Sequence, residues 1–350
     1  MTLKAQSVSS YALSTAIRNT ILRSQSDLLT AQQEVASGTH ADMGLSLGVT
    51  TGRIVSLGKQ YDQLNAIVDT NGIVSSRMEA AQTALSSLVE QAQSFTSSLT
   101  GARNAADGAA IITPLAQGAL QNATDLMNTN VGGEFIFAGI NTDTKPIADY
   151  GAGSAAQTAI ENAFQAKFGM AITDPNVSTI SATDLKSFID NELTNEFSSA
   201  QWSANWSSAS DDVVQNRIAP QELADTSVSA NESGVRKLFM AYAMVGTFAS
   251  ANLNQDAYTT LVDSGLSLTQ EGIREVTTAQ SVLGTSQSRV TAASDRLSAQ
   301  VNVLEKSVNS LEAVDPYEAA TRVNSLMTQL ENSYALTAKL QGMSLLNYLK

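Results

Sequence analysis

The chain has no cysteine and only one histidine, His40, in 350 residues. The lack of cysteine excludes disulfides, thiolate chemistry and metal sites built on sulfur. A single histidine leaves a serine–histidine–aspartate triad with one possible base, and it excludes a metal site with two histidine ligands within one chain. Enzymatic hypotheses therefore have little support, and we expect a protein that is not an enzyme, with no catalytic residue, no metal site and no cofactor. The one enzymatic alternative is a hydrolase within residues 141–235, which would need a carboxylate pair in a cleft.

Aromatic residues, basic residues and long apolar runs are also scarce. Aromatics make up 5% of the chain and hydrophobic residues 43%, so the apolar content is mainly alanine, leucine and valine, which suit close helix packing. A net charge of −13 without a lysine or arginine cluster argues against nucleic acid and anionic membranes. No stretch approaches the roughly 20 apolar residues of a membrane span, and the N-terminus lacks the apolar run of a secretory signal. We expect no nucleic-acid partner and no membrane insertion.

The sequence does contain long stretches of helical periodicity. From Leu57 to Ala102, apolar residues recur every three or four positions, which predicts a long helix with a coiled-coil seam. Asn71 is the one polar residue in this seam, where it either sets the register or is simply tolerated. The seam positions are Tyr61, Leu64, Ile67, Asn71, Val74, Met78, Ala81, Leu85, Leu88, Ala92, Phe95, Leu99 and Ala102.

A second long helix is predicted in the last third of the chain. Its seam repeats at intervals of seven, at Val276, Leu283, Val290, Leu297, Leu304 and Leu311. Because neither helix can bury its stripe alone, we expect the two to pack antiparallel against each other.

Amphipathic helices are predicted at both ends of the chain. The first stops near Ser37-Gly38, where glycine permits a left-handed termination. The last begins at Asp315-Pro316, which supplies an N-cap aspartate and a proline at the first helical position. The first 26 residues contain three basic residues and no acid, and they are rich in serine and threonine. Such a segment buries little surface by itself, so we expect it to order on a partner.

The segment 141–235 differs in composition from both helical regions. It holds thirteen acidic and four basic residues, which gives −9 of the total charge of −13, and both tryptophans, Trp202 and Trp206. Apolar spacing predicts one short helix through Phe164 that ends at Gly169 and another through Phe188. VSTIS at 177–181 and VVQNRI at 213–218 are candidate strands. The predicted fold class is therefore mostly α, with long antiparallel coiled-coil helices from both termini in a bundle and a central α+β insert.

Three features suggest chemistry, and each has a simpler interpretation. Residues 151–156 match the G-x-G-x-x-A outline of a dinucleotide-binding turn, but no βαβ alternation surrounds them, so we interpret them as a loop before a helix at 157–168. His40 would need an orienting carboxylate such as Asp42 and a nucleophile, and we expect an exposed loop histidine. Asp143 and Asp211-Asp212 lack the spacing of a calcium loop and are expected to be solvated turn carboxylates.

The helical region ends in the segment GGEFIFAGINTDTKPI at 132–147. Phe135, Ile136 and Phe137 form a short strand-like apolar core between glycines. This Phe-Ala-Gly turn followed by Asn-Thr-Asp-Thr resembles the flagellin superfamily, and within it the FlgL-type hook-associated proteins. Three further stretches carry the resemblance: LTAQQEVASGTHADMGLSLG at 29–48, LEAVDPYEAATRV at 311–323 and SYALTAKLQGMSLLNYL at 333–349. The chain lacks the Ile-Ser-Ser-Gly-Leu start and the Leu-Leu-Arg-type ending of filament flagellins.

The resemblance implies a structural subunit of the bacterial flagellum, at the junction between hook and filament. It also implies export through the flagellar type III apparatus with an export chaperone, an extracellular location, and contacts with further copies of the chain, with the hook-side hook-associated protein and with flagellin. A filament flagellin and a secreted coiled-coil adhesion or secretion factor are the alternatives. The expected domains are a 1–40 axial helix paired with 312–350, a helical bundle from 41–140 and 236–311, and an outward-facing insert at 141–235.

The apolar spacing of the terminal helices predicts the residues of the axial assembly interface. In the first helix these are Ile17, Ile21 and Leu28, and in the last helix they are Leu326, Leu330, Tyr334, Leu345, Leu346 and Leu349. In a helical tube, identical subunits meet head to tail through heterologous contacts, so ordering of such termini would couple folding to assembly.

Overall fold

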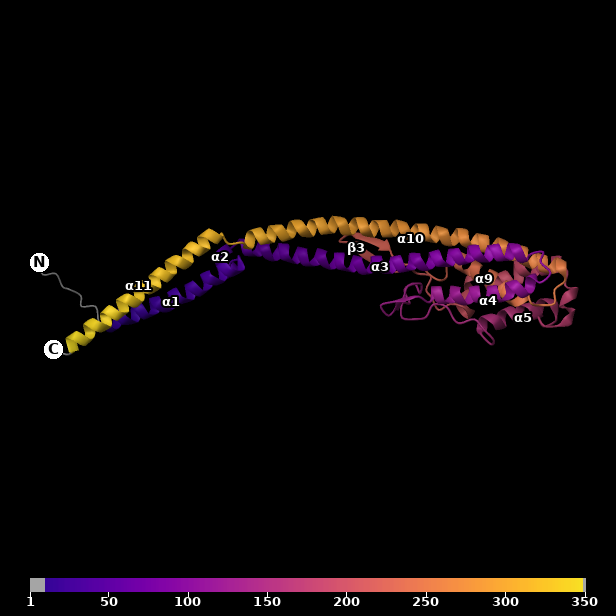
Figure 1. The fold of residues 1–350 in the computed structure, drawn as a ribbon, viewed down its shortest axis with the longest axis horizontal. Coiled ribbons are helices and arrows are strands. Elements are labelled where there is room, and N and C mark those ends of the chain that lie inside the picture. Colours follow the sequence, from indigo (N-terminus) through magenta and orange to yellow (C-terminus); the bar gives the residue numbers. More distant parts are fainter. Residues whose placement is uncertain (1–9, 349–350) are drawn as a thin grey trace. The chain divides into compact units, whose positions relative to one another are not determined.

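The computed structural model describes residues 10–348, and 74% of the chain is helical. The chain divides into two compact units, residues 1–65 with 299–350 and residues 66–298. The main helices are α1 (Ser10–Ser37), α2 (Met43–Leu47), α3 (Thr50–Ala102), α4 (Gly108–Met127), α9 (Ser233–Phe248), α10 (Gln255–Glu312) and α11 (Pro316–Tyr348) (Figure 1). The predicted fold class, mostly α with long packed helices and a small central region with short sheets, is confirmed.

In the first unit, α1 and α11 pack antiparallel against each other (Figure 1). Helix α1 ends at Gly38, whose φ of +73° is the left-handed conformation that favours glycine. Helix α11 begins after Asp315, whose carboxylate Oδ1 accepts a hydrogen bond from the Tyr317 N–H at 2.8 Å. Both predicted helix ends are confirmed.

In the second unit, α3 and α10 run antiparallel, as predicted. The side-chain amide of Gln82 donates to the Gln280 carbonyl at 2.8 Å, and further along the pair Arg103 meets Asp263. The predicted seam of α3 is buried from Asn71 to Ala102. Helix α10 buries its heptad positions from Val276 to Leu297 in the same way.

Helix α9 lies inside this unit and is almost entirely buried from Leu238 to Phe248. Its sequence from Leu238 to Phe248 is apolar apart from Tyr242, Gly246 and Thr247, so it lacks the polar stripe of a surface helix. It packs against α4, and a Cβ at Gly272 of α10 would lie 2.7 Å from the side chain of Leu238. Sequence reasoning did not separate α4 and α9 from the long helices, because it followed the longest seams.

The region between α4 and α9 contains mostly short helices. They are α5 (Ala155–Phe168), the 3-10 helix η1 (Pro175–Thr179), α6 (Ala182–Phe188), the π-helix η2 (Ile189–Leu193), α7 (Thr194–Glu196) and α8 (Ser199–Asn205). Helix α5 ends at Gly169 as predicted. Phe164 and Phe188 pack on Phe248, and Trp202 packs edge-on against Phe239 at 5.4 Å. Because both of these partner phenylalanines belong to α9, the insert shares its aromatic core with the helical bundle.

One of the two predicted strands of the insert is wrong. Residues 175–179 form η1 and not a strand, because Pro175 fixes the backbone at its start and Asp174 caps it by accepting from the Asn176 N–H at 2.8 Å. The other prediction is confirmed by β3 (Gln215–Ala219), which pairs antiparallel with β4 (Glu222–Asp225).

The turn at 132–147 begins with a tight hairpin. Strands β1 (Asn130–Val131) and β2 (Glu134–Phe135) are joined by Gly132 and Gly133, whose φ values of +65° and +94° a two-residue hairpin requires. Ile136 and Phe137 lie beyond the strand and are buried, so only the first part of the expected apolar strand is regular structure.

Candidate assembly interface

The α1–α11 pair buries a narrow seam of small and medium-sized side chains. Ala31 of α1 is 1% exposed and Ala319 of α11 is fully buried. Ser24 and Leu330 are also buried. Further along the pair, the Gln25 side-chain amide donates to the Tyr334 hydroxyl at 2.8 Å. The seam thus joins the two terminal helices within one chain.

The predicted axial residues divide between this seam and the exposed surface. Ile17, Ile21, Leu28 and Leu326 are half-buried, Leu330 is buried, and Tyr334 is 51% exposed. Leu345 and Leu346 belong to α11, but the structure does not describe their side chains, and Leu349 lies outside the described residues. The structure brings the described members together on one helix pair, and their role in contacts between subunits stays a prediction.

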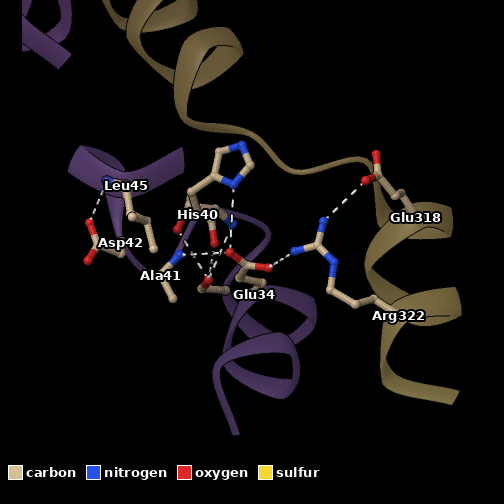
Figure 2. Close-up of polar contacts among 9 residues, drawn as sticks. Glu34, His40, Ala41, Asp42, Leu45, Glu318 and Arg322 are labelled. Atoms are coloured by element: carbon tan, nitrogen blue, oxygen red, sulfur yellow. Dashed lines mark hydrogen bonds and ion pairs between the residues drawn. The ribbon is translucent and has the colours of Figure 1, made fainter. Parts of the chain in front are cut away.

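Glu34 makes the main polar contacts at the end of the helix pair where α1 ends and α11 begins (Figure 2). Its side chain is 3% exposed. One carboxylate oxygen accepts from the Arg322 guanidinium of α11 at 3.1 Å, and the other accepts from the Ala41 N–H at 3.3 Å. Arg322 also donates to Glu318 at 3.1 Å. A buried carboxylate is stable only when it is paired in this way, so Glu34 fixes the end of α1 against the start of α11.

The backbone of the two connecting segments is paired at the same place. The Val314 N–H donates to the Gly38 carbonyl at 2.9 Å, and the His40 N–H donates to the Glu312 carbonyl at 3.0 Å. Together with the Glu34 contacts, these bonds tie the exit from α1 to the entry into α11. We call Glu34, Arg322 and these paired backbones the α1–α11 joint.

His40 is part of this joint and not an exposed loop residue, which corrects the expectation from sequence. Its side chain is 23% exposed, and its Nδ1 lies 3.6 Å from a Glu34 carboxylate oxygen. Asp42, the carboxylate near it in sequence, instead caps α2 by accepting from the Leu45 N–H at 2.9 Å (Figure 2). His40 is half-buried because the Glu312 end of α10 crosses its backbone, a contact that local sequence does not reveal.

The helix pair also carries apolar side chains that no other part of the described chain covers. Leu22 and Leu29 of α1, seven residues apart and therefore on one face, are 58% and 67% exposed. Val35 of α1, with Met327 and Leu336 of α11, are about half exposed as well. Exposed apolar residues repeated along a helix pair are typical of a surface that a partner covers. Only Leu22 and Leu29 are spaced so that they share one side of α1, and we call these two residues the outer face.

The other sequence candidates form no reactive site among the described residues. Residues 151–154 form a loop in which the Ser154 hydroxyl accepts from the Gln157 N–H at 3.2 Å, so this loop caps α5 and does not follow a strand. Asp211 accepts from the Asn231 side-chain amide at 2.7 Å. Within residues 10–348, no group of three or more histidine, cysteine or acidic side chains could hold a metal ion. None of the described helices is both long and apolar enough to cross a membrane.

Sequence reasoning missed Glu34 and Arg322. The available signal was a charged residue within each apolar stripe: Glu34 follows Ala31 by three residues, and Arg322 follows Ala319 by three. Two opposite charges at such positions on helices expected to pair indicate an ion pair across the seam. The partner assignment itself needs the register between the two helices, which the structure supplies.

Two protein-family models match the chain, one at each of its terminal helical regions. Residues 8–142 match the bacterial flagellin N-terminal helical region, and residues 266–349 match the bacterial flagellin C-terminal helical region. Together these matches cover more than half of the chain. A search of curated protein sequences found no match.

The fold is also found in a solved structure. A Vibrio parahaemolyticus protein described as a flagellar hook-associated protein aligns with a TM-score of 0.51 at 11% identity, over 75% of this chain and 97% of that chain. The family matches and the shared fold agree with the long paired helices at both ends. This chain therefore belongs to the bacterial flagellin family, whose members are structural, extracellular proteins of the flagellum and not enzymes.

Proposed function

We propose that this chain is the hook–filament junction protein of the flagellum. The single observation that supports this role best is the alignment of the fold with a hook-associated protein over nearly all of that protein's length. The Phe-Ala-Gly turn and the departures at both ends of the sequence from filament flagellins favour the same subclass. A filament flagellin is the second candidate, because both family matches are to flagellin regions.

The mechanism of this role is physical. The terminal regions 1–40 and 312–350 pack in the axial tube, and the outer face of α1 contacts neighbouring copies. The long helices within 41–140 and 236–311 form the next shell, and the acidic segment 141–235 faces outward, where like charge keeps neighbouring subunits soluble and apart. The partners are further copies of the chain, the hook-side hook-associated protein, flagellin and an export chaperone.

A junction subunit must present different surfaces to the hook below and to the filament above. Heterologous contacts allow this, because the surface patch that binds the layer below differs from the patch that binds the layer above. Ordering of the terminal segment on arrival couples folding to assembly, which disfavours polymerisation before export.

Electron microscopy and motility of a strain without this gene test the proposal. We expect intact hooks, no filaments and flagellin released into the medium, with filaments restored by the wild-type gene on a plasmid. Filaments that persist at normal length would rule out a junction role. Missing filaments without released flagellin would instead indicate that the chain is itself the filament subunit.

A further inference from the structure

A groove in the second unit contains no residue of α1 or α11 in its lining. It lies between α4, α5 and α9, has a volume of about 760 Å³ and is lined by both polar and apolar side chains. Loops contribute Tyr150, Gly151 and Thr173 to its rim. This volume is within the usual range for a small-molecule site.

Gln117, Gln121, Gln157 and Asn252 contribute side-chain amides to the lining. Gln117, Gln121 and Gln157 each donate one hydrogen bond inside the chain, to the Gly246 carbonyl, to Asp125 and to Glu161 respectively. Each amide carries two donor hydrogens and an acceptor oxygen. After the one bond within the chain, each amide therefore still has a donor hydrogen and an acceptor oxygen for a ligand. Groups that can donate and accept next to each other match the neighbouring hydroxyls of a polyol.

An aromatic ring forms part of the wall. Tyr150 stacks on Trp206 with 5.1 Å between ring centroids and 6° between planes, and its hydroxyl lies 3.0 Å from the Thr247 hydroxyl. Trp206 is in turn stacked on Trp202 at 5.4 Å. The three stacked rings hold Tyr150 rigidly, so its ring is already ordered before a ligand binds.

Tyr242 forms a buried part of the groove wall. Tyr242 lines the groove and is fully buried, and its hydroxyl has no hydrogen-bond partner among residues 10–348. Burial also raises the pKa of Tyr242, so this hydroxyl stays protonated as a donor. Because neighbouring atoms enclose this oxygen, a ligand in the groove meets the other polar side chains of the lining and not the Tyr242 hydroxyl.

The charge at the groove decides which class of ligand fits. Lysine and arginine are both missing from the described lining, and its one carboxylate, Glu161, is held by Gln157 at 2.7 Å. An anionic ligand would meet no counter-ion there, and a cation would meet a single exposed carboxylate. An extended peptide would require apolar anchor pockets or a free strand edge, whereas amides, hydroxyls and one fixed ring favour sugar. From this arrangement we propose that the groove binds a neutral saccharide.

Titration of the full-length chain with neutral hexose and N-acetylhexosamine trisaccharides tests the proposal. Calorimetry gives the affinity, and tryptophan fluorescence reports locally because Trp202 and Trp206 are the only tryptophans. We expect saturable binding that Tyr150→Ala weakens at least about tenfold and Gln157→Ala about threefold or more. Tyr150→Phe keeps the ring and should change the affinity less than about threefold.

The control variant Asn195→Ala removes an exposed amide from a separate groove between α7 and α10. It should bind like wild type, and circular dichroism should show that every variant remains folded. Lack of saturable binding of any neutral trisaccharide by the wild-type chain would overturn the proposal, as would affinity unchanged in folded Tyr150→Ala. Tighter binding of sulfated or sialylated sugars, or of a serine- and threonine-rich peptide, would also overturn it. None of these results bears on the junction role, which the gene deletion tests separately.

Discussion

The side-chain amide of Asn71 on α3 donates a hydrogen bond to the backbone carbonyl of Ile218 in β3, at 2.9 Å. Asn71 is fully buried, and its partner lies 147 residues away. The polar residue of the coiled-coil seam therefore attaches the β3–β4 hairpin to the long helix. This differs from both roles considered from sequence, since Asn71 neither pairs across the seam nor is left in it without a function.

Replacing Asn71 with leucine should therefore destabilise the chain, although leucine suits a seam better. The change leaves the Ile218 carbonyl without its partner, at a cost of about 1 kcal/mol in the free energy of unfolding. Amide hydrogen exchange should rise in residues 215–225 more than in the neighbouring turns of α3. A leucine variant that is more stable than wild type, with unchanged exchange in the hairpin, would contradict this assignment.

Breaking the Glu34–Arg322 contact should loosen the α1–α11 joint. Glu34→Ala removes a buried acceptor that serves both Arg322 and the Ala41 N–H, and we expect a loss of about 1–3 kcal/mol, reduced from the cost of a fully buried pair because Arg322 is 46% exposed. Glu318→Gln is the matched control. It removes a 72% exposed partner of the same arginine and should cost less than about 0.5 kcal/mol.

Chemical denaturation of single and double variants measures this coupling. If Glu34→Ala and Arg322→Ala act through one contact, the double variant should lose less than the sum of the two single losses. Fully additive losses would show that the two residues stabilise the joint independently.

The outer face and the seam should respond differently to an acidic substitution. Leu29→Asp changes an exposed residue, so the isolated chain should keep its stability within about 0.5 kcal/mol but fail to support filaments. Leu330→Asp places a charge in the buried seam and should destabilise the helix pair by several kcal/mol. Gln33→Asp, an exposed polar position on α1, is the control and should support filaments.

Complementation of the deletion strain by each variant, with motility as the readout, checks these expectations. If Leu29→Asp restores motility fully, the outer face is not an assembly surface. If Leu330→Asp and Leu346→Asp both leave assembly untouched, the predicted axial residues are wrong.

Gly139 explains why the Phe-Ala-Gly turn ends in glycine. Its φ is +62°, and a Cβ at this position would lie 2.4 Å from the Ser210 carbonyl oxygen and 2.5 Å from that of Asp212. Gly139→Ala should therefore cost at least about 2 kcal/mol of stability, from backbone strain and from displacement of the opposing chain. The comparison is Gly118→Ala in α4, where the added methyl group meets open space and helix propensity should give a neutral or slightly stabilising effect. Thermal melting of both variants measures the difference in stability. Equal melting temperatures for the two variants would contradict the steric argument.

The Arg103–Asp263 ion pair should add to the acid sensitivity of the α3–α10 contact. The hydrogen bond from the Arg103 guanidinium and its charge lower the pKa of Asp263. A carboxyl whose pKa is lower in the folded chain stabilises the fold above its unfolded pKa of about 4 and loses this effect as pH falls through the folded value. Asp263→Asn should therefore flatten the fall in melting temperature below pH 4. An unchanged pH profile would mean that the pair contributes nothing measurable at this exposed position.

Much of the helical framework was predictable because its signals are local. The end of α1 at Gly38, the cap of α11 at Asp315 and the end of α5 at Gly169 each depend on a few consecutive residues. The strand predicted at 177–181 is wrong because its β-branched residues follow an aspartate and a proline, which favour a helical turn.

The candidate interface was predictable in part. Apolar spacing identified Leu330 and the half-buried residues of the seam, but it gave no reason to choose between a contact within the chain and one between subunits. His40 was expected to be exposed because its sequence neighbours are small and polar, yet the end of α10 covers it.

The sequence by itself determined the long helices of this protein, the end of α1, the start of α11, the seams that must be buried and the absence of cysteine chemistry, since periodicity, capping and composition act over a few turns of chain. Tertiary structure decided which partner each buried polar group meets. Glu34 finds Arg322 across 288 residues and Asn71 finds Ile218 across 147. The physical reason is that burial and hydrogen bonding depend on which distant segments come together, and this depends on packing of the whole chain rather than on any local pattern.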